Sequence, residues 1–265
     1  MIDEKNSEKS IVSVIIPTCN RPPYLKKCID SVLMQTYQNF EILVVDNSTE
    51  KFIKKNKEVS LGFNDSRVKY FRIGQKNGAQ ESRNFGINNA KGRYLAFIDD
   101  DDEWVPEKLE EQLKFFDDLT ALVSCKTQDS FEIKNLSPKF QDLIKKYTLG
   151  TTSTFVIKKD VLIKVGLFDI NCPAAQDHEL GLRISKNFKV KIVPLVLVKR
   201  NTLNNHIGIN FIKRIRGHLY LFTKYSKNYS IIDKIKFICW ILILLSCLIL
   251  NCKTEKYIKK IQEWI

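Results

Sequence analysis

The chain has 265 residues, of which 44% are hydrophobic and 28% are charged, as in folded globular proteins. It contains no low-complexity tract and no internal repeat, and its length suits one large α/β domain with a modest appendage. The formal net charge is +13 at pH 7, so an anionic partner is expected, either a nucleic acid or an acidic lipid.

Apolar runs of strand length alternate with helical periods in the first half of the chain. Buried strands are predicted at residues 11–16, 41–45, 68–72 and 94–98. Helices are predicted after Pro22-Pro23, at 82–90 and at 106–117. This alternation indicates an α/β fold with a mainly parallel sheet and right-handed crossovers. Because such sheets bind ligands beyond the carboxyl ends of their strands, the polar clusters at 17–21, 46–48 and 99–102 are candidate site residues.

The second half is less regular. Strands are predicted at 151–157 and 190–198, and helices at 159–165 and 177–187. A basic, aromatic region with helical periodicity follows at about 207–229, then an apolar run from Phe237 to Leu250 and a final basic helix.

Four consecutive carboxylates, Asp99 to Asp102, follow the fourth predicted strand. They repel one another unless a cation joins them, and Mg²⁺ or Mn²⁺ takes oxygen ligands of this kind. The alternative is a solvated acidic turn that caps the helix beginning near Pro106. Capping needs one aspartate and leaves three unexplained.

The basic residues gather at the end of the chain, where thirteen lysines and arginines from Lys199 onward face three acidic residues. The apolar run between them has fourteen residues, fewer than the roughly 20 that a spanning helix needs. Lysines flank it on both sides, which favours contact with an anionic membrane surface. A domain core or an interface in a homo-oligomer is the alternative.

The seven cysteines show no paired metal-binding spacing. Met1 to Ser10 is polar and lacks the apolar stretch of a secretion signal. We therefore expect free thiols and a cytoplasmic protein, peripheral at the inner face of the cell membrane.

Seven stretches match, in order and spacing, the motifs of one known family over roughly residues 11–200. They are Val14–Arg21, Phe40–Thr49, Asn77–Ala79, Arg83–Ile87, Gly92–Tyr94, Phe97–Pro106, and Gly166–Asp169 with Gln176–Leu180. In these motifs the chain resembles the family 2 glycosyltransferases of bacterial cell-surface polysaccharide synthesis. The resemblance implies a GT-A (Rossmann-like) fold, with a mainly parallel sheet flanked by helices and a C-terminal helical extension.

On this basis the chain divides into three parts. Residues 1–10 form an N-terminal tail, and residues 11–200 form the GT-A catalytic domain. Its nucleotide-binding half covers 11–105 and its acceptor-side half covers 106–200. Residues 201–265 form the basic and apolar helical extension.

The resemblance also implies roles for individual residues. The donor nucleotide is expected to contact Pro17, Thr18, Cys19, Asn20, Arg21, Asp46, Asn47, Arg83, Asp99 and Asp100. Asp101, with Asp99, is expected to bind a divalent metal, Mn²⁺ or Mg²⁺, and Asp177 matches the general base of the inverting members. Trp104, His178 and Glu179 are expected on the acceptor side.

Three positions depart from the family pattern. Cys19 stands where an aromatic residue is usual, and the segment from Asp46 to Ser48 is one residue shorter than the usual Asp-Asp-Gly-Ser. Gln176 replaces the usual glutamate before the base. The expected contacts with the nucleobase of the donor are therefore less well defined than the metal site.

The expected function is inverting transfer of a sugar from a UDP-sugar to an acceptor hydroxyl, on a lipid-linked or surface glycan. A sugar-nucleotide nucleotidyltransferase is the rival enzyme, but its first strand leads into a glycine-rich loop, and residues 18–23 contain no glycine. A nucleic-acid-binding module would use the basic tail, yet no nucleic-acid motif is present and the acidic cluster would have no role. No nucleic-acid partner is therefore expected.

Overall fold

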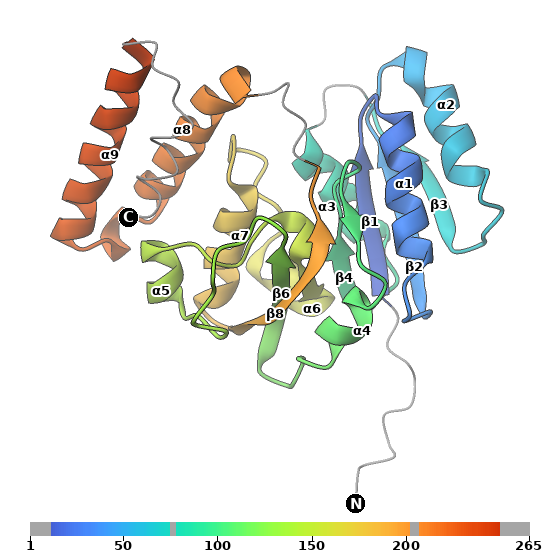
Figure 1. Ribbon diagram of the computed structural model, residues 1–265, viewed down its shortest axis with the longest axis horizontal. Coiled ribbons are helices and arrows are strands. Elements are labelled where there is room, and N and C mark those ends of the chain that lie inside the picture. Colours follow the sequence, from blue (N-terminus) through green and yellow to red (C-terminus); the bar gives the residue numbers. More distant parts are fainter. Residues whose placement is uncertain (1–11, 75–77, 202–206, 250–265) are drawn as a thin grey trace, which may run out of the picture.

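One sheet, covered by helices on both faces, forms the centre of the molecule (Figure 1). The computed structural model describes residues 12–74, 78–201 and 207–249. The expected tail at 1–10, Asn77, Leu250 and the final basic helix lie outside the described residues. The strands within the described ranges are β1 Val12–Thr18, β2 Phe40–Asp46, β3 Val68–Arg72, β4 Tyr94–Phe97, β5 Glu103–Trp104, β6 Thr120–Thr127, β7 Val156–Lys158 and β8 Lys189–Lys199.

The helices connect these strands and extend the chain beyond them. They are α1 Pro22–Leu33, α2 Glu50–Leu61, α3 Ala79–Asn89, α4 Lys108–Leu113, α5 Phe140–Lys145, α6 Lys159–Val165, α7 Gln176–Ser185, α8 Ile207–Lys224 and α9 Ile231–Ile249. Two short 3₁₀ helices are η2 Thr152–Thr154 and η4 Ser226–Asn228.

The strand order is β3-β2-β1-β4-β7-β6-β8-β5. The pairings among β3, β2, β1 and β4 are all parallel, so the carboxyl ends of β1, β2 and β4 meet at one edge. In the second half β7 is antiparallel to both β4 and β6, and β5 is antiparallel to β8, whereas β6 and β8 run parallel. The α/β fold with a mainly parallel sheet is confirmed, and each antiparallel pair involves β7 or β8.

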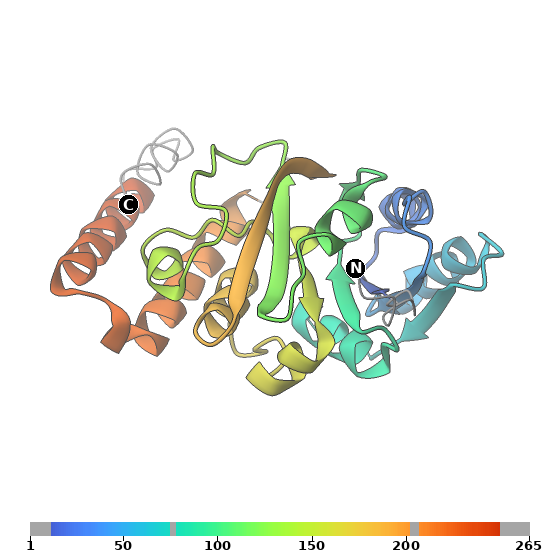
Figure 2. The same cartoon turned by 90° about the horizontal axis from the view of Figure 1, so that it is seen from below.

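Two apolar layers hold the helices on the sheet. Alternate residues of β1 point to opposite faces, so Val14 packs with α1 and α4 and Ile15 packs with α3, α6 and α7. Figure 2 shows the sheet from below, with α1 and α4 on one side and α3, α6 and α7 on the other. The parallel strands are buried along their whole length, which explains their continuous apolar runs.

Two expected elements differ from the structure. The strand expected at 151–157 begins as the 3₁₀ helix η2, because Thr154 and Phe155 donate their backbone N–H groups to Thr151 and Thr152, and only Val156–Lys158 pairs in the sheet. The helix expected at 106–117 is limited to α4, Lys108–Leu113. Four elements, α2, β5, β6 and α5, were not predicted.

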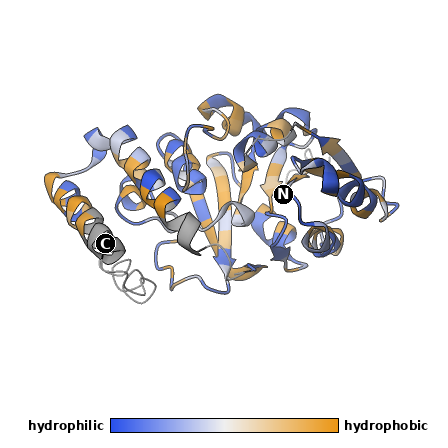
Figure 3. Cartoon of the chain, turned by 90° about the horizontal axis from the view of Figure 1, so that it is seen from above, coloured by the Kyte–Doolittle hydropathy of each residue, from blue (hydrophilic) through white to orange (hydrophobic). Residues whose placement is uncertain are grey.

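The C-terminal extension forms two helices at one end of the molecule (Figure 1). Helix α8 lies beside α7, and α9 packs on α8 through stacked rings of Phe222 and Phe237, whose centroids are 4.1 Å apart. Figure 3 shows hydrophobic residues recurring along α9. Within the described part of the chain, no helix combines the length and apolarity required to cross a membrane.

Candidate active site

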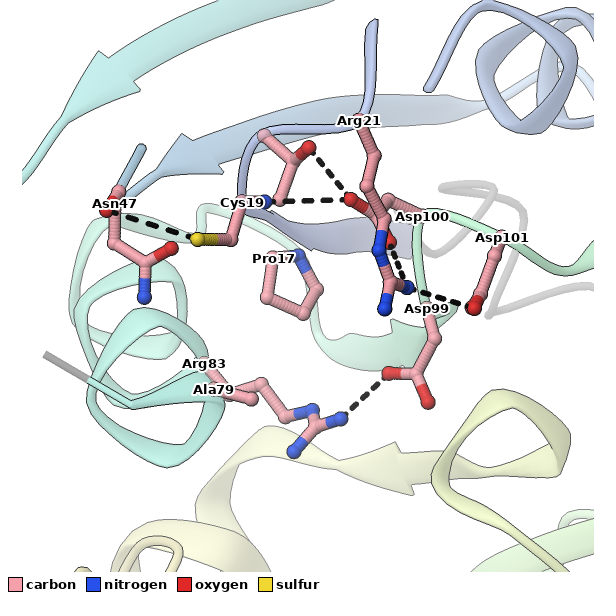
Figure 4. Close-up of a pocket in the computed structure, with 10 residues that line it drawn as sticks. Pro17, Cys19, Arg21, Asn47, Ala79, Arg83, Asp99, Asp100 and Asp101 are labelled. Carbon is pink, nitrogen blue, oxygen red and sulfur yellow. Dashed lines mark hydrogen bonds and ion pairs between the residues drawn. The ribbon is translucent and has the colours of Figure 1, made fainter. Parts of the chain in front are cut away.

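A polar pocket of about 410 Å³ opens at the carboxyl ends of β1, β2 and β4. Its walls come from the turn after β1, the end of β2, the start of α3 and the acidic segment after β4 (Figure 4). The lining residues are Pro17, Thr18, Cys19, Arg21, Asn47, Ala79, Arg83, Asp99, Asp100 and Asp101. Eight of the ten residues expected to bind the donor line this pocket, the exceptions being Asn20 and Asp46.

Asp100 and Asp101 are joined to the turn after β1 by one arginine. Arg21 Nη1 donates to Asp101 Oδ2 at 2.7 Å and to Asp100 Oδ1 at 3.3 Å. Asp100 Oδ2 also accepts from the hydroxyl of Thr18 at 2.7 Å and from the backbone N–H of Cys19 at 3.3 Å. Asp100 thus holds the two halves of the pocket together, and Asp101 remains at its edge (Figure 4).

Asp102 points away from this pocket and has a structural role. Its carboxylate accepts from Ser153 Oγ at 2.6 Å and from the backbone N–H of Asn201 at 3.2 Å. The same Ser153 oxygen accepts the backbone N–H of Asp99 at 3.0 Å. The acidic turn is therefore attached to η2 through one serine.

Burial raises the free energy needed to ionise all the carboxyl groups of the acidic segment. It raises the pKa of Asp100 to about 6 and that of Asp102 to about 7, and it also raises the pKa of Asp101. Arg21 lowers the pKa of both Asp100 and Asp101 but does not reverse the shift. A further cation at this edge would offset the remaining repulsion.

The residues present fit a hard divalent cation. Asp99 and Asp101 offer carboxylate oxygens at the pocket wall, with side-chain exposures of 38% and 22%. Among the described residues, no group of three or more metal-ligating side chains is assembled in advance. A cation held by one or two carboxylates must complete its shell with phosphate oxygens and water, which is the habit of Mg²⁺ and not of a closed zinc site.

Arg83, on α3, supplies positive charge from the opposite wall. Its side chain is 5% exposed, and Nη2 contacts Asp99 Oδ1 at 2.5 Å (Figure 4). Its Nε and Nη1 atoms are buried and have no hydrogen-bond partner among the described residues. Because buried donors cost free energy when they stay unpaired, these two nitrogens favour an anionic ligand in the pocket.

Asp46 and Asn20 support the turns after β2 and β1 from behind the pocket. Asp46 is fully buried and accepts from Ser48 N at 2.8 Å, Asn56 Nδ2 at 3.1 Å and Tyr70 OH at 2.7 Å. Asn20 has a positive φ of 60°, and its side-chain oxygen accepts the backbone N–H of Thr49 at 3.0 Å. Neither side chain lines the pocket, and both hold the turns that do.

Asp177, the expected general base, lies at the start of α7. Its Oδ1 accepts the backbone N–H of His178 at 2.8 Å. Burial raises the pKa of Asp177; the positive charge of Arg83 lowers it, and the negative charge of Asp99 raises it further. Asp177 is thus close enough to the pocket to interact electrostatically with both residues, although it is not one of the lining residues.

Two of the three residues expected on the acceptor side are engaged elsewhere. Trp104 is 4% exposed, donates its indole N–H to Ser153 O at 3.0 Å, and packs under the ammonium of Lys108. Glu179 is fully buried and forms ion pairs with Arg183 at 2.7 Å and Lys224 at 2.9 Å. An acceptor cannot reach either side chain, so the expectation for Trp104 and Glu179 is wrong.

His178 also packs inward. Its ring stacks on Tyr147 with centroids 4.3 Å apart, and burial lowers its pKa to about 3. A neutral, stacked imidazole can support Asp177 from behind but offers no charge to an acceptor.

Two residues of the site were not predicted. Ser153 attaches the acidic turn to η2, and Ala79 opens α3 at the pocket wall. The stretch Asn77–Ala79 was recognised as a motif without a role. Its position at the start of α3 is the feature that could have indicated a binding role, since helix N-termini present free N–H groups to anions.

The amino-acid sequence matches the model of one protein family, described as Glycosyl transferase family 2, over residues 13–170. An uncharacterised glycosyltransferase of Methanocaldococcus jannaschii is 30% identical over 227 residues, which cover 79% of this chain and 76% of the relative. The UDP-Glc:alpha-D-GlcNAc-diphosphoundecaprenol beta-1,3-glucosyltransferase WfgD of Escherichia coli is 39% identical over 103 residues, covering 39% of this chain and 40% of the relative.

A solved structure shares the fold at low identity. The mannosyltransferase PcManGT of Pyrobaculum calidifontis, in complex with GDP-Man and Mn²⁺, aligns with a TM-score of 0.67 at 18% identity, over 83% of this chain and 65% of that one. Four other relatives, uncharacterised glycosyltransferases of Rickettsia species, are longer than this chain, which spans 18% to 65% of their length.

Proposed function

Since this chain belongs to glycosyl transferase family 2 and has the GT-A fold, we propose that it transfers a sugar from a nucleotide-diphosphate donor, a UDP-sugar, to an acceptor hydroxyl with inversion at the anomeric carbon. One observation supports this most directly. Arg83, whose guanidinium has two buried nitrogens without a hydrogen-bond partner among the described residues, lines the same pocket as Asp99 and Asp101. A pocket with an anion-binding arginine and two hard oxygen donors suits a diphosphate together with a divalent cation.

The donor would lie along the turn after β1. Its nucleoside would contact Thr18, Cys19 and Asn47, and its diphosphate would face Arg83 and the start of α3. Asp101 and Asp99 would hold Mn²⁺ or Mg²⁺. That cation would stabilise the negative charge that develops on the diphosphate leaving group.

Asp177 would act as the general base. In a single displacement the acceptor oxygen forms a bond to the anomeric carbon, the bond to the diphosphate breaks, and the hydroxyl proton passes to the Asp177 carboxylate. Two pocket residues, Arg83 and Asp99, act electrostatically on the Asp177 carboxylate, which supports this role.

The acceptor is proposed to be a lipid-linked or surface glycan. The name of WfgD specifies a diphosphoundecaprenol-linked acceptor for that relative. In this chain, α9 exposes Ile231, Ile235, Ile238 and Leu242 by 53% to 76%, at the spacing of one helical face. Lys234 and Lys236 of α9 accompany them, so we propose that α9 lies on an anionic membrane surface.

A donor screen tests the reaction. Purified protein is incubated with UDP- and GDP-sugars, and release of the nucleoside diphosphate is measured with Mn²⁺ and again with EDTA. Metal-dependent hydrolysis of one UDP-sugar is expected. Release from no donor, together with no stabilisation of the protein by UDP and Mn²⁺, would contradict the proposed function.

A further inference from the structure

The loop that leads to Asp177, residues 166–175, is held by the C-terminal helix α8. Asp169 lies in this loop, and Glu179 lies one half-turn after Asp177 in α7. Both carboxylates are bound by the same side chain, because Lys224 Nζ is 2.6 Å from Asp169 Oδ2 and 2.9 Å from Glu179 Oε1. Tyr220, one turn earlier in α8, donates to Asp169 Oδ2 at 2.5 Å.

The backbone of this loop needs such support. Ala175, the residue before α7, has left-handed angles of φ 59° and ψ 38°, which a residue with a Cβ adopts only when its surroundings impose them. Helix α8 packs directly on the preceding residue, because a Cβ added to Gly217 would lie 2.6 Å from the carbonyl oxygen of Ala174. Helix α8 therefore contacts the loop in two ways. Gly217 packs against the loop backbone, and Lys224 binds the side chain of Asp169.

The loop also has attachments to α7 and α3, at its start and along its length. Arg183 donates to the carbonyl oxygens of Val165, Gly166 and Leu167, and its guanidinium also binds Glu179. From α3, Gln80 Nε2 donates to Cys172 O at 2.9 Å. Asn84 of α3 holds the backbone of Phe168. Within the described residues, the Asp169 side chain accepts from Asn171 N in its own loop and otherwise from Tyr220 and Lys224 of α8.

We propose that Lys224, together with Tyr220, is a positioning residue for the reaction: by binding Asp169 and Glu179 on either side of Asp177, it fixes where the base carboxylate lies. This inference rests on the proposed function, in which Asp177 is the base. It makes α8 part of the catalytic unit, although its sequence lies outside the region that matches the family.

The test compares three substitutions of solvent-accessible lysines. Lys224→Met removes the charge and keeps the length of the side chain, Lys224→Arg keeps the charge, and Lys227→Met is the control. Lys227 follows Lys224 closely, is exposed, and makes no ion pair within the described residues. Turnover at saturating donor, the KM for acceptor, donor affinity by calorimetry and the melting temperature are measured for each variant.

Lys224→Met is expected to lower kcat roughly tenfold or more with donor affinity unchanged, since small displacements of a reacting group have large kinetic effects. Lys224→Arg should recover most of the turnover, and Lys227→Met should match the unchanged protein. Wild-type kcat in Lys224→Met would overturn the inference. A parallel fall of kcat, donor affinity and melting temperature would do the same, since it would mean a purely structural role.

A double-mutant cycle separates this inference from the proposed function. If Lys224 acts through Asp177, Lys224→Met should cause little further loss in an Asp177→Asn background. Independent, multiplying losses would overturn the positioning role. Wild-type turnover in Asp177→Asn alone would instead refute the assignment of the base.

Discussion

At the scale of single residues, the four aspartates of the acidic segment, Asp99 to Asp102, differ in burial and in their partners. Asp100 and Asp102 are buried and engaged by Thr18 and Ser153, whereas Asp99 and Asp101 are more exposed at the pocket wall. Consecutive carboxylates therefore differ in role because the turn points them in different directions. Arg21 offsets part of their negative charge, and the proposed metal would offset more of it.

The metal assignment is tested by two neighbouring, isosteric substitutions. Asp101→Asn is expected to weaken donor binding in Mn²⁺ by roughly 10–100-fold, because a carboxylate ligand is lost while the fold is kept. Asp102→Asn is the control, and calorimetry should find metal-dependent donor binding unchanged in it. Unaltered affinity in Asp101→Asn would exclude Asp101 as a ligand.

The base assignment is tested at Asp177. Asp177→Asn is expected to lower turnover by a factor of roughly 10²–10⁴ while donor affinity stays the same. Single-turnover rates at saturating donor and Mn²⁺ measure this loss. Turnover near the wild-type value would leave Asp177 with only its role at the start of α7.

The pH dependence provides the second part of this test. The base works only when ionised, and burial raises the pKa of Asp177. Activity should therefore be complete above the raised pKa and fall as the pH drops through it, at a value above the roughly 3.9 of a free aspartate. This acidic limb should be absent from the residual activity of Asp177→Asn.

At the scale of secondary structure, the contact between α3 and β1 sets the position of Arg83. Gly86 lies one turn after Arg83 in α3, and a Cβ added there would lie 2.6 Å from Ile15 Cγ2. The helix can approach the sheet this closely only because Gly86 has no side chain. The guanidinium of Arg83 thereby reaches Asp99 and the pocket.

Gly86→Ala is therefore expected to lower the free energy of unfolding by about 1–3 kcal/mol, because Ile15 has no space to yield in a close-packed core. Donor affinity should fall with it as α3 shifts. Gly74→Ala is the matched control, since a Cβ at Gly74 meets no atom within 4 Å. Denaturant melts of both variants give the comparison, and equal stabilities would show that α3 can move away without cost.

At the scale of the whole molecule, the two described helices of the extension, α8 and α9, make different contacts. Helix α8 is bound to the catalytic domain by Lys224 and Tyr220, whereas α9 contacts α8 through Phe222 and Phe237 and exposes its isoleucines. The catalytic domain and the proposed membrane-binding face thus meet at α8.

Deletion of residues 231–265 tests this division. The truncated protein should keep metal-dependent donor binding, because the pocket residues all precede residue 102 and α8 remains. It should no longer sediment with vesicles that contain anionic lipid, whereas the full chain should sediment and be partly released by salt. Equal sedimentation of both proteins would exclude α9 as the membrane-binding face, and a dimer lost on deletion would identify it as an interface between copies.

Local patterns determined the first half of the fold and the polar edge of the site. The strands β1, β2 and β4 are buried on both faces and so read as continuous apolar runs, and the acidic segment follows one of them directly. Helix α2 was missed because its fully buried residues, Asn56 and Ser60, are polar and weaken the helical pattern. Strand β6 was missed because its run mixes apolar with polar side chains that are buried all the same.

Tertiary structure alone decided which candidate side chains face the pocket. Trp104 and Glu179 follow site motifs closely in sequence, yet Ser153 binds the first and Lys224, 45 positions further on, binds the second. Residue order places a side chain near a site, but its direction depends on partners that only the folded chain supplies. For the same reason the proposed positioning role of α8 could not be inferred from its basic composition. The ammonium of Lys224 forms ion pairs with two carboxylates of its own chain, which only the folded structure brings together.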